Sequence, residues 1–596
     1  MKKRVADIIM DTLIEYGIDT CFAVVGGGAM HLDNALLVCD KMKKIFNHHE
    51  QACSMAADAY ARYSGKMAAV CVTSGPGATN AITGVMGAWV DNLPMIVLSG
   101  QVRYAVSVPQ SGLNLRYRGI QEFDIIGSVK NMTKYAKMII NPLEIKREVV
   151  KAINLAMDGR RGPVWLDIPQ DIQNAMVEED ELYDVEEFIS EVPSINEKDI
   201  DEIIEIIQDA ERPCILLGSG IIATGNRDKC IEVLQNVKIP ILGASWVSDS
   251  FYAEHEMFFG NSGDAGPRTG NFILQNADVI LSIGNTLHFR QTSFKQDEFA
   301  PQAKVIMVYP DDEESKKPGL NIHRFIQADI RDILDKLNGR LKNIEVPGTW
   351  LSYCQMLKKR FSPYESIENL DMKERVSSYY FWKKLSEYEA EDSILSLGNN
   401  TACSSKLQVG TKKAKQRVMT NYNCGSMGFE LPAAIGAAMA SGKSVTCVTG
   451  DGSIMMNLQE LQTIKHYDLP INVVVFSNGG YAALRRTFNN FYNGAFIGCT
   501  PDTGVGFPDF EDVAKTFGYE YYRCESNEQV EEYVKKLCTS DKRIFVEMCQ
   551  KYEDLVAPRL MSRIDENGVM QSPALHDMYP FLDKEEMDEL MISRKQ

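Results

Sequence analysis

One stretch, residues 444–486, carries the residue types that could hold a divalent cation next to a phosphate group. Its apolar pattern predicts a strand ending at Gly450, then a helix, then a second strand over 471–476 that is apolar throughout, as in a parallel strand buried on both faces. A right-handed crossover brings the carboxyl ends of two such strands to one edge of a sheet. Asp451 and Asn478 follow the two strands, so their oxygens are predicted to meet there.

The chemistry expected at this edge is the binding of Mg²⁺ and diphosphate. Mg²⁺ is commonly held by one or two protein oxygens together with phosphate oxygens and water. The helix start beside Asp451 is opened by Gly450 and Gly452, and helix N-termini favour phosphate. The alternative is that GDG and NGG are two unrelated turns, because each is common alone.

The elements around this stretch read as alternating strands and helices. In the first 175 residues, strands are expected over 20–25, 67–73, 95–99 and 164–168. Further strands are expected over 213–218, 239–243, 279–284, 305–309 and 393–397. Such alternation predicts parallel sheets covered by helices on both faces. Gly26–Gly28 lacks the GxGxxG spacing, so it is weak evidence for a dinucleotide.

Composition limits the classes of protein. A chain of 596 residues is too long for one core, and three or four domains are expected. The net charge of −18 argues against nucleic acid or an anionic membrane as a partner. No apolar run approaches the length of a membrane span. The 14 cysteines form no CxxC pair, which indicates reduced thiols and a cytoplasmic protein rather than disulfides or a zinc site.

The order GDGS, helix, strand, Asn-Gly resembles the thiamine-diphosphate motif, and the chain to about residue 555 is similar to the acetohydroxyacid (acetolactate) synthase family. The matching segments are residues 48–66, 72–80, 98–102, 120–136, 162–171 and 421–440. The resemblance implies an α/β fold of three doubly wound parallel-sheet domains. These are a pyrimidine-binding domain over 1–180, a central domain over 195–345 and a diphosphate- and Mg-binding domain over 370–555, followed by a tail or lid over 556–596.

The resemblance also assigns roles to residues, with thiamine diphosphate and Mg²⁺ as cofactors. It implies that Asp451, the Asn478 amide oxygen and the Gly480 carbonyl bind Mg²⁺, that Glu50 faces the pyrimidine ring nitrogen, and that Gln121 contacts the reacting substrate. Met427 would wedge between the two cofactor rings, and the Gly425 carbonyl would accept from the cofactor's amino group. The full set of implied cofactor contacts is Gly27, Gly77, Asn400, Thr401, Gly425, Met427, Gly452 and Ser453.

The reaction implied is decarboxylation of a 2-oxo acid such as pyruvate and ligation of the two-carbon unit to a second carbonyl compound. Arg290 matches an arginine that anchors the acceptor's carboxylate, although it could also be a surface ion-pair residue. Ile120 stands where the family has Phe, and Arg486-Thr487 where it has Gln-Trp. These departures leave room for a larger or more anionic acceptor.

Several alternatives stay open. A carboligase acting on another acceptor, such as a nucleotide-linked keto sugar, fits the altered pocket. A simple 2-oxo-acid decarboxylase is a third reading, but the paired histidines of such enzymes are not found. A catalytically inactive regulatory subunit is opposed by the joint presence of Glu50, Met427, Asp451 and Asn478.

Two further expectations concern the central domain and the assembly. Family members often hold FAD there through an arginine, but Thr286 stands at that position, so FAD is expected to bind weakly or not at all. Glu430, which replaces the usual glycine, has no interpretation. The resemblance further implies a homodimer or homotetramer, with each site shared between the pyrimidine-facing domain of one chain and the diphosphate-facing domain of another.

Overall fold

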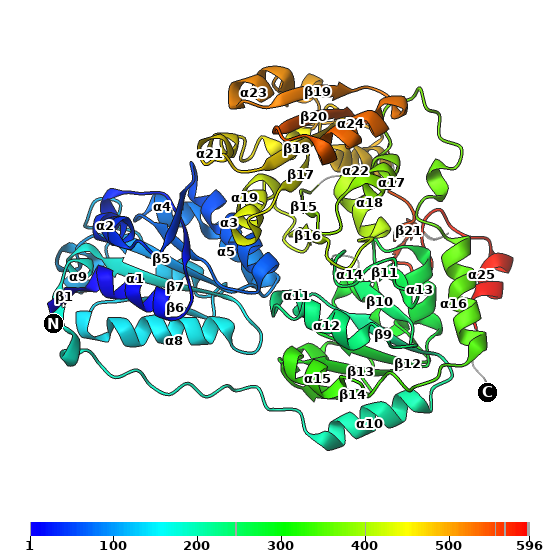
Figure 1. The fold of residues 1–596 in the computed structure, drawn as a ribbon, viewed down its shortest axis with the longest axis horizontal. Coiled ribbons are helices and arrows are strands. Elements are labelled where there is room, and N and C mark those ends of the chain that lie inside the picture. Colours follow the sequence, from blue (N-terminus) through cyan, green and yellow to red (C-terminus); the bar gives the residue numbers. More distant parts are fainter. Residues whose placement is uncertain are drawn as a thin grey trace. The chain divides into compact units, whose positions relative to one another are not determined.

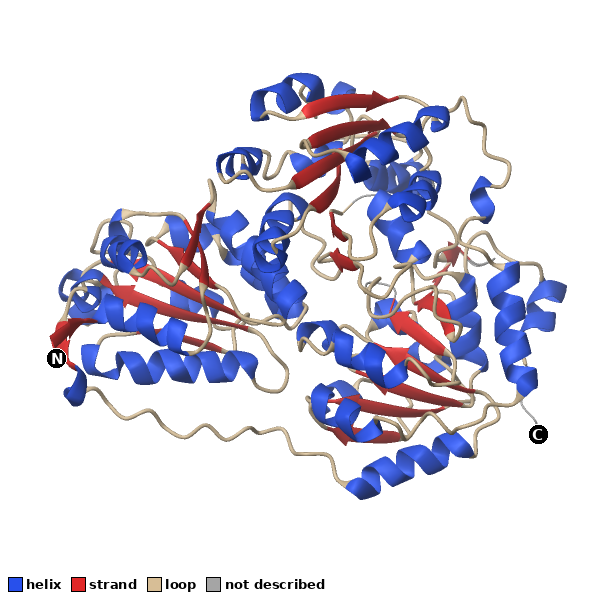
Figure 2. Cartoon of the chain, in the orientation of Figure 1, coloured by secondary structure: helices blue, strands red, loops and turns tan. Residues whose placement is uncertain are grey.

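Three six-stranded sheets organise the chain (Figures 1 and 2) in a computed structural model that describes residues 2–244, 247–399, 401–552, 554, 556–564 and 568–592. The chain forms two compact units. The first comprises Met1–Glu191, Asn421–Lys443 and Met456–Ile471, and the second comprises Val192–Thr420, Ser444–Met455 and Asn472–Gln596. Among the described residues, none of the helices is both long enough and apolar enough to cross a bilayer.

The first sheet belongs to the N-terminal part of the chain and has the strand order β3-β2-β4-β5-β7-β6. Its neighbouring strands all pair in parallel. Its strands are β2 (Thr20–Ala23), β3 (Lys43–Phe46), β4 (Ala69–Val72), β5 (Met95–Gln101), β6 (Tyr135–Met138) and β7 (Pro163–Pro169). Its main helices are α1 (Val5–Glu15), α2 (Met30–Val38), α3 (Glu50–Ser64), α4 (Pro76–Asn80), α5 (Ile82–Val90), α7 (Ile125–Val129) and α8 (Ile145–Met157). Strands β2, β4, β5 and β7 are buried throughout, as predicted for parallel strands covered on both faces.

The central sheet has the order β11-β10-β9-β12-β13-β14, so the chain order reverses between β9 and β12. Its strands are β9 (Pro213–Leu217), β10 (Ile241–Ala244), β11 (Phe258–Ser262), β12 (Val279–Ile283), β13 (Lys304–Tyr309) and β14 (Arg324–Gln327). Its main helices are α10 (Glu197–Gln208), α12 (Arg227–Leu234), α13 (Arg268–Asn276), α14 (Phe289–Thr292), α15 (Ile330–Leu337) and α16 (Gly348–Arg360). The acidic stretch after β8 (Met176–Glu178) is largely exposed, as expected of a linker.

The third sheet has the order β16-β15-β17-β18-β20-β19. Its strands are β15 (Ile394–Leu397), β16 (Arg417–Met419), β17 (Val445–Gly450), β18 (Ile471–Ser477), β19 (Glu520–Cys524) and β20 (Ile544–Cys549). Its main helices are α17 (Ser378–Tyr388), α18 (Thr401–Val409), α20 (Asp451–Ile454), α22 (Ala482–Tyr492), α23 (Phe510–Phe517) and α24 (Asn527–Thr539). Three sheets of this kind confirm the predicted α/β fold class.

The sequence predicts a single helix after Gly450, and this prediction is wrong in one respect. The segment forms two helices, α20 and α21 (Glu460–His466). The Asn457 amide lies in the break and donates a 2.8 Å hydrogen bond to the carbonyl of Gly428. An asparagine that bonds to backbone elsewhere competes with the helical pattern. The apolar residues of the stretch do recur at helical spacing, but the helix is interrupted at Asn457.

Helix α19 (Glu430–Ser441) packs against α3 within the first compact unit. The backbones approach so closely that a Cβ on Gly436 would lie 2.0 Å from the carbonyl oxygen of Ala56. Only glycine fits at such a crossing. This packing fixes the segment before α19, residues 421–429, relative to the start of α3.

The C-terminal tail packs against the central domain of its own chain. Leu575 and Leu590 join the apolar cluster that contains Phe272 and Trp350. The Asn276 amide donates to the carbonyl of Leu590 at 3.1 Å. The described part of the tail, including α25 (Lys584–Leu590), is therefore a strap within one chain.

Candidate functional site

Asp451 lies at the carboxyl end of β17 and organises the loop that follows β18. Its Oδ2 accepts backbone hydrogen bonds from Asn478, Gly479 and Gly480 at 2.9, 2.8 and 3.1 Å, and its Oδ1 accepts from the amide of Gly452 at 2.8 Å. Burial raises the pKa of Asp451, and these amides oppose that rise. The structure thus places Asp451 and Asn478 side by side, as the crossover argument predicts.

The Asn478 side chain is oriented by a series of hydrogen bonds that runs through Gln550 to the Asp554 carboxylate. Its Nδ2 donates to Gln550 Oε1 at 3.1 Å, and Gln550 Nε2 donates to Asp554 Oδ2 at 2.8 Å. The Asn478 Oδ1 is thereby turned to the other side, where it accepts from Arg485 Nη2 at 3.1 Å. Gln550 was not predicted, and no spacing rule in the sequence pairs it with Asn478.

Two glycines of this region lie where a side chain would collide with a neighbour. A Cβ on Gly480, whose φ is 142°, would lie 2.0 Å from the carbonyl oxygen of Cys499, and one on Gly452 would lie 2.1 Å from the Tyr481 ring. Carboxylate, amide and carbonyl oxygens of Asp451, Asn478 and Gly480 form a set of hard donors. That set fits Mg²⁺, which binds oxygen ligands.

The remaining residues predicted near the diphosphate lie close in sequence to these elements. Gly452 and Ser453 are buried in α20. Thr401 is the first residue of α18, which follows β15. Asn400 lies outside the described residues.

Glu50 is the first residue of α3 and is 9% exposed. Its Oε2 accepts a 3.0 Å hydrogen bond from Asn80 Nδ2, and a Cβ on Gly77 would stand 3.3 Å from its Oε1. The structure therefore brings Glu50 and Gly77 together, as the matching segments imply. Asn80 is a contact that sequence reasoning missed, although it closes the segment over 72–80 that carries Gly77.

The loop after β2 is tight at Gly26 and Gly28 rather than at Gly27. A Cβ on Gly26 would lie 2.6 Å from Thr73, and one on Gly28 would lie 2.5 Å from Ser74, whereas nothing lies within 4 Å of a Cβ on Gly27. The carbonyl of Gly27 accepts from Gln170 Nε2 at 2.5 Å. Gly27 is exposed, and the space beside its Cα is open to a ligand.

Gln121 is exposed and has a left-handed backbone with φ 59°. A Cβ on Gly75 would lie 2.5 Å from its carbonyl oxygen. The next residue, Glu122, accepts from the amides of Arg118 and Gly119 at 2.7 and 2.8 Å. A non-glycine residue held at positive φ is strained, and such strain clusters at functional sites.

Gly425 and Met427 precede α19 and belong to the same compact unit as Glu50. Gly425 has φ 63° and donates its amide to the carbonyl of Asn421 at 2.7 Å. Met427 is half-buried. Asn423 Nδ2 donates to Asp91 Oδ1 at 2.8 Å, which ties this segment to the end of α5.

Arg290 lies in α14, in the central domain. Its Nη1 is 3.2 Å from Asp264 Oδ2, and its carbonyl accepts from the Asp264 amide at 2.6 Å. The Asp264 carbonyl in turn accepts from Leu560 of the tail at 3.1 Å. Arg290 therefore has a carboxylate neighbour in its own chain.

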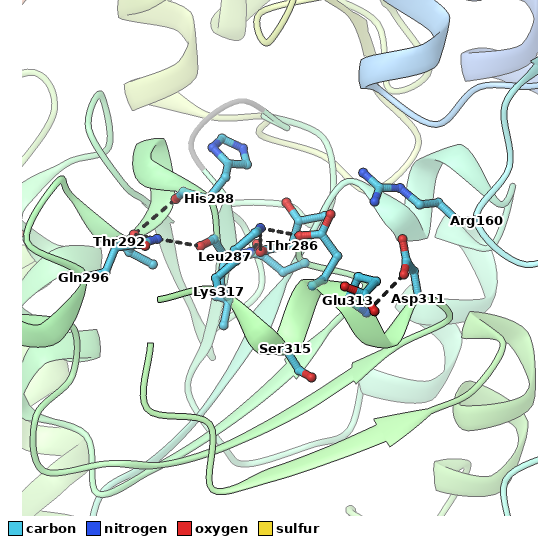
Figure 3. A network of polar contacts seen from close by, with 12 residues as sticks. Arg160, Thr286, Leu287, His288, Thr292, Gln296, Asp311, Glu313, Ser315 and Lys317 are labelled. Carbon is cyan, nitrogen blue, oxygen red and sulfur yellow. Dashed lines mark hydrogen bonds and ion pairs between the residues drawn. The ribbon is translucent and has the colours of Figure 1, made fainter. Parts of the chain in front are cut away.

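The turn after β12, where Thr286 stands at the position of the family's FAD-contacting arginine, is shown in Figure 3. Lys317 donates to the carbonyl of Thr286 at 2.5 Å and pairs with Glu314. Gly220 donates to the carbonyl of Gly284 at 2.9 Å, so the loops after β9 and β12 touch directly. Thr286 itself carries no charge, and its carbonyl is bonded to the Lys317 ammonium. Weak or absent FAD binding stays a prediction.

Comparisons with known proteins match three successive parts of the chain to one class of enzyme. Residues 3–125 match "Thiamine pyrophosphate enzyme, N-terminal TPP binding domain", residues 200–337 match "Thiamine pyrophosphate enzyme, central domain", and residues 397–548 match "Thiamine pyrophosphate enzyme, C-terminal TPP binding domain". The chain is thus a thiamine-diphosphate-dependent enzyme.

The relatives narrow the family. A probable acetolactate synthase large subunit of Methanocaldococcus jannaschii is 30% identical over 552 residues, covering 90% of each chain. The acetolactate synthase isozyme 2 large subunit of Escherichia coli strain K12 is 29% identical over 540 residues, covering 90% of this chain and 93% of the relative. The chloroplastic acetolactate synthase 2 of Zea mays is 28% identical over 576 residues, covering 94% and 87%. The chain belongs to the acetolactate synthase large-subunit family of thiamine-diphosphate enzymes.

Proposed function

We propose that the protein uses thiamine diphosphate and Mg²⁺ to decarboxylate a 2-oxo acid such as pyruvate and to ligate the two-carbon unit to a second carbonyl compound. The observation that carries this proposal is the loop over 478–480, which is folded around the Asp451 carboxylate by three backbone amides. Asp451, Asn478 Oδ1 and the Gly480 carbonyl would hold the metal, and Gly452, Ser453 and Thr401 would lie toward the diphosphate.

Glu50 has the protonation role in this proposal. When bound, thiamine diphosphate supplies the electron sink for loss of CO₂ from a 2-oxo acid. Glu50 would share a proton with the pyrimidine ring nitrogen, and Asn80 would hold the carboxyl in place through its 3.0 Å hydrogen bond. Met427, Gly425 and Gly77 would shape the space around the rings, and Gln121 would contact the substrate.

Arg290 and Thr487 are the residues that bear on the acceptor. Arg290 would bind an acceptor carboxylate, with Asp264 fixing the guanidinium when the site is empty of substrate. Thr487 on α22 is exposed and bonds back to the carbonyl of Ala483 at 3.2 Å, so no bulky side chain projects from this position. That observation favours a second candidate, a carboligase that transfers the two-carbon unit to a larger acceptor such as a nucleotide-linked keto sugar.

One experiment separates these reactions. The purified protein is incubated with thiamine diphosphate, Mg²⁺, pyruvate and a panel of acceptors, and products are identified by mass. Acetolactate from pyruvate alone supports the first candidate, and a product only with a larger acceptor supports the second. Acetaldehyde and CO₂ alone would indicate a simple decarboxylase, and no cofactor-dependent loss of pyruvate with any acceptor would contradict the proposal.

A further inference from the structure

A buried arginine, Arg485, holds the same loop that Asp451 holds. It lies near the start of α22 and is 2% exposed. Its Nη1 donates to the carbonyl oxygens of Asn478 and Gly479 at 3.1 and 3.3 Å, and its Nη2 donates to Asn478 Oδ1 at 3.1 Å. The Asp451 carboxylate therefore holds the loop through its backbone amides, and the Arg485 guanidinium holds it through its oxygen atoms.

The guanidinium is held firmly but not fully satisfied. Its Cζ lies 3.6 Å from the centroid of the Tyr552 ring, a separation at which a cation is attracted to the ring face. Its Nε, although buried, has no hydrogen-bond partner among the described residues. An arginine keeps its charge in a protein, and a buried donor without a partner is costly. Arg485 is therefore a fixed positive charge with one donor left over.

This charge stands at the atom proposed to bind the metal. Asn478 Oδ1 would be shared between the guanidinium and Mg²⁺, and two cations that share one oxygen repel each other. A bound diphosphate would offset the repulsion between the guanidinium and Mg²⁺, because its negative charge attracts both cations. The affinity for the metal should therefore depend on whether the diphosphate is present.

We propose that Arg485 couples metal binding to diphosphate binding, by weakening the site for a free divalent cation and not for the cation that arrives with a diphosphate. The proposal rests on the metal and diphosphate sites of the proposed function, but not on the reaction or the acceptor. The loop keeps its anchor when Arg485 is removed, because Asp451 Oδ2 still accepts its three amides. The main change in Arg485→Met should then be the loss of charge.

The test measures the dissociation constant of Mn²⁺, as a probe for Mg²⁺, from the electron paramagnetic resonance signal of the free ion. The full-length wild type, Arg485→Met and Arg486→Met are titrated with and without thiamine diphosphate, with protein-free titrations to correct for Mn²⁺ bound by the cofactor. Arg486→Met is the matched control, since it removes the same charge from the adjacent position of α22. The coupling is the ratio of the two dissociation constants.

In Arg485→Met, Mn²⁺ alone should bind about tenfold more tightly than in the wild type, because a nearby unit charge is removed, and the coupling should fall by a similar factor. Arg486→Met should keep the wild-type coupling. Arg485→Lys, which retains the charge, should stay closer to the wild type than Arg485→Met does. If thermal melting shows that Arg485→Met does not fold, Arg485→Gln makes the same comparison.

Unchanged or weaker binding of Mn²⁺ alone in the neutral variant, with the coupling intact, would overturn the role of Arg485 and leave only a loop anchor. A wild type that binds no Mn²⁺ even with thiamine diphosphate would overturn the metal site itself. The two failures are therefore distinguishable, and neither depends on finding the acceptor.

Discussion

Glu50 and Asp451 are both carboxylates at the first turn of a helix, but their surroundings differ. Both oxygens of Asp451 accept hydrogen bonds from backbone amides, which keeps the carboxylate in one position, as its proposed role as a metal ligand requires. Glu50 accepts one side-chain amide, from Asn80, and its other oxygen faces Gly77, where no side chain stands. One carboxylate is built to stay fixed, and the other keeps an oxygen available for a proton.

Glu50→Gln should leave cofactor binding intact and reduce turnover. An amide cannot share an acidic proton with the ring nitrogen, and acid-base groups typically contribute ~10²–10⁴-fold to rate. Turnover is measured as CO₂ release from pyruvate at saturating cofactor. Asn80→Ala, which leaves the carboxyl but removes its hydrogen bond, serves as the graded control and should lose less. Near-normal turnover of Glu50→Gln would remove Glu50 from the mechanism.

Some of these residue relations were predictable and others were not. Asp451 and Asn478 meet because parallel strands end at one edge, a rule that works on sequence alone. The approach of Asn80 to Glu50, and of Gln550 to Asn478, depends on the angle between elements that no local pattern encodes. No local pattern in the sequence assigns Arg485 to this loop, and its bonds to the loop carbonyls emerge from the fold of α22.

At the scale of elements, the paired strands β5 and β7 hold a buried carboxyl that should respond to pH. Asp167 accepts from Ser99 Oγ at 2.6 Å and from Gln101 Nε2 at 3.0 Å. Burial raises the pKa of Asp167 to about 7, against the lowering effect of these two bonds. The native state therefore retains a proton that the unfolded chain releases near pH ~4.

Because the native state binds more protons than the unfolded chain in this window, stability should fall as pH rises from about 4 to about 7. Asp167→Asn cannot ionise and should lack this contribution. The thermal midpoint of the wild type minus that of Asp167→Asn should therefore decrease across this range. Subtracting the variant removes the effect of other titrating groups. Parallel midpoint curves for the two proteins would show that Asp167 does not titrate as described.

The boundaries of helices and strands are only partly predictable from the apolar pattern of the sequence. The predicted strand over 471–476 corresponds to β18, because an unbroken apolar run has few alternatives. The predicted helix after Gly450 breaks at Asn457, whose side chain bonds to Gly428. The tail is predicted as a tail or lid, and its described part packs on α13 and α16 of its own chain. Contacts between residues far apart in the sequence determine both the helix break and the position of the tail.

At the scale of the whole molecule, the candidate functional residues divide between two compact units. Glu50, Gly77, Gln121, Gly425 and Met427 lie in the first, and Asp451, Gly452, Asn478 and Gly480 lie in the second. One cofactor has to touch both sets in the proposed function. We propose a homodimer or homotetramer in which the pyrimidine-facing residues Glu50, Gly77 and Gln121 of one site come from one chain. The diphosphate-facing residues of that site, Gly425 and Met427 among them, come from another chain.

Complementation tests this proposal. Glu50→Gln and Asp451→Ala proteins, each inactive alone, are mixed under conditions that exchange subunits. A two-fold pairing completes two sites at once, so a mixed dimer should hold one doubly altered site and one intact site and should recover activity. Mixing two preparations of the same variant is the control. No recovery after demonstrated exchange and with saturating cofactor would mean that each site is built from a single chain.

The central claim is that Glu50 and the Asp451 loop serve one thiamine diphosphate, and CO₂ release from pyruvate tests it most directly. Protein stripped of cofactor and metal is assayed before and after thiamine diphosphate and Mg²⁺ are restored, for the wild type, Glu50→Gln and Asp451→Ala. The account predicts release by the wild type only with both additions, cofactor binding without release by Glu50→Gln, and loss of metal-dependent cofactor binding by Asp451→Ala. Release by the stripped wild type, or release at the wild-type rate by either variant, would contradict it.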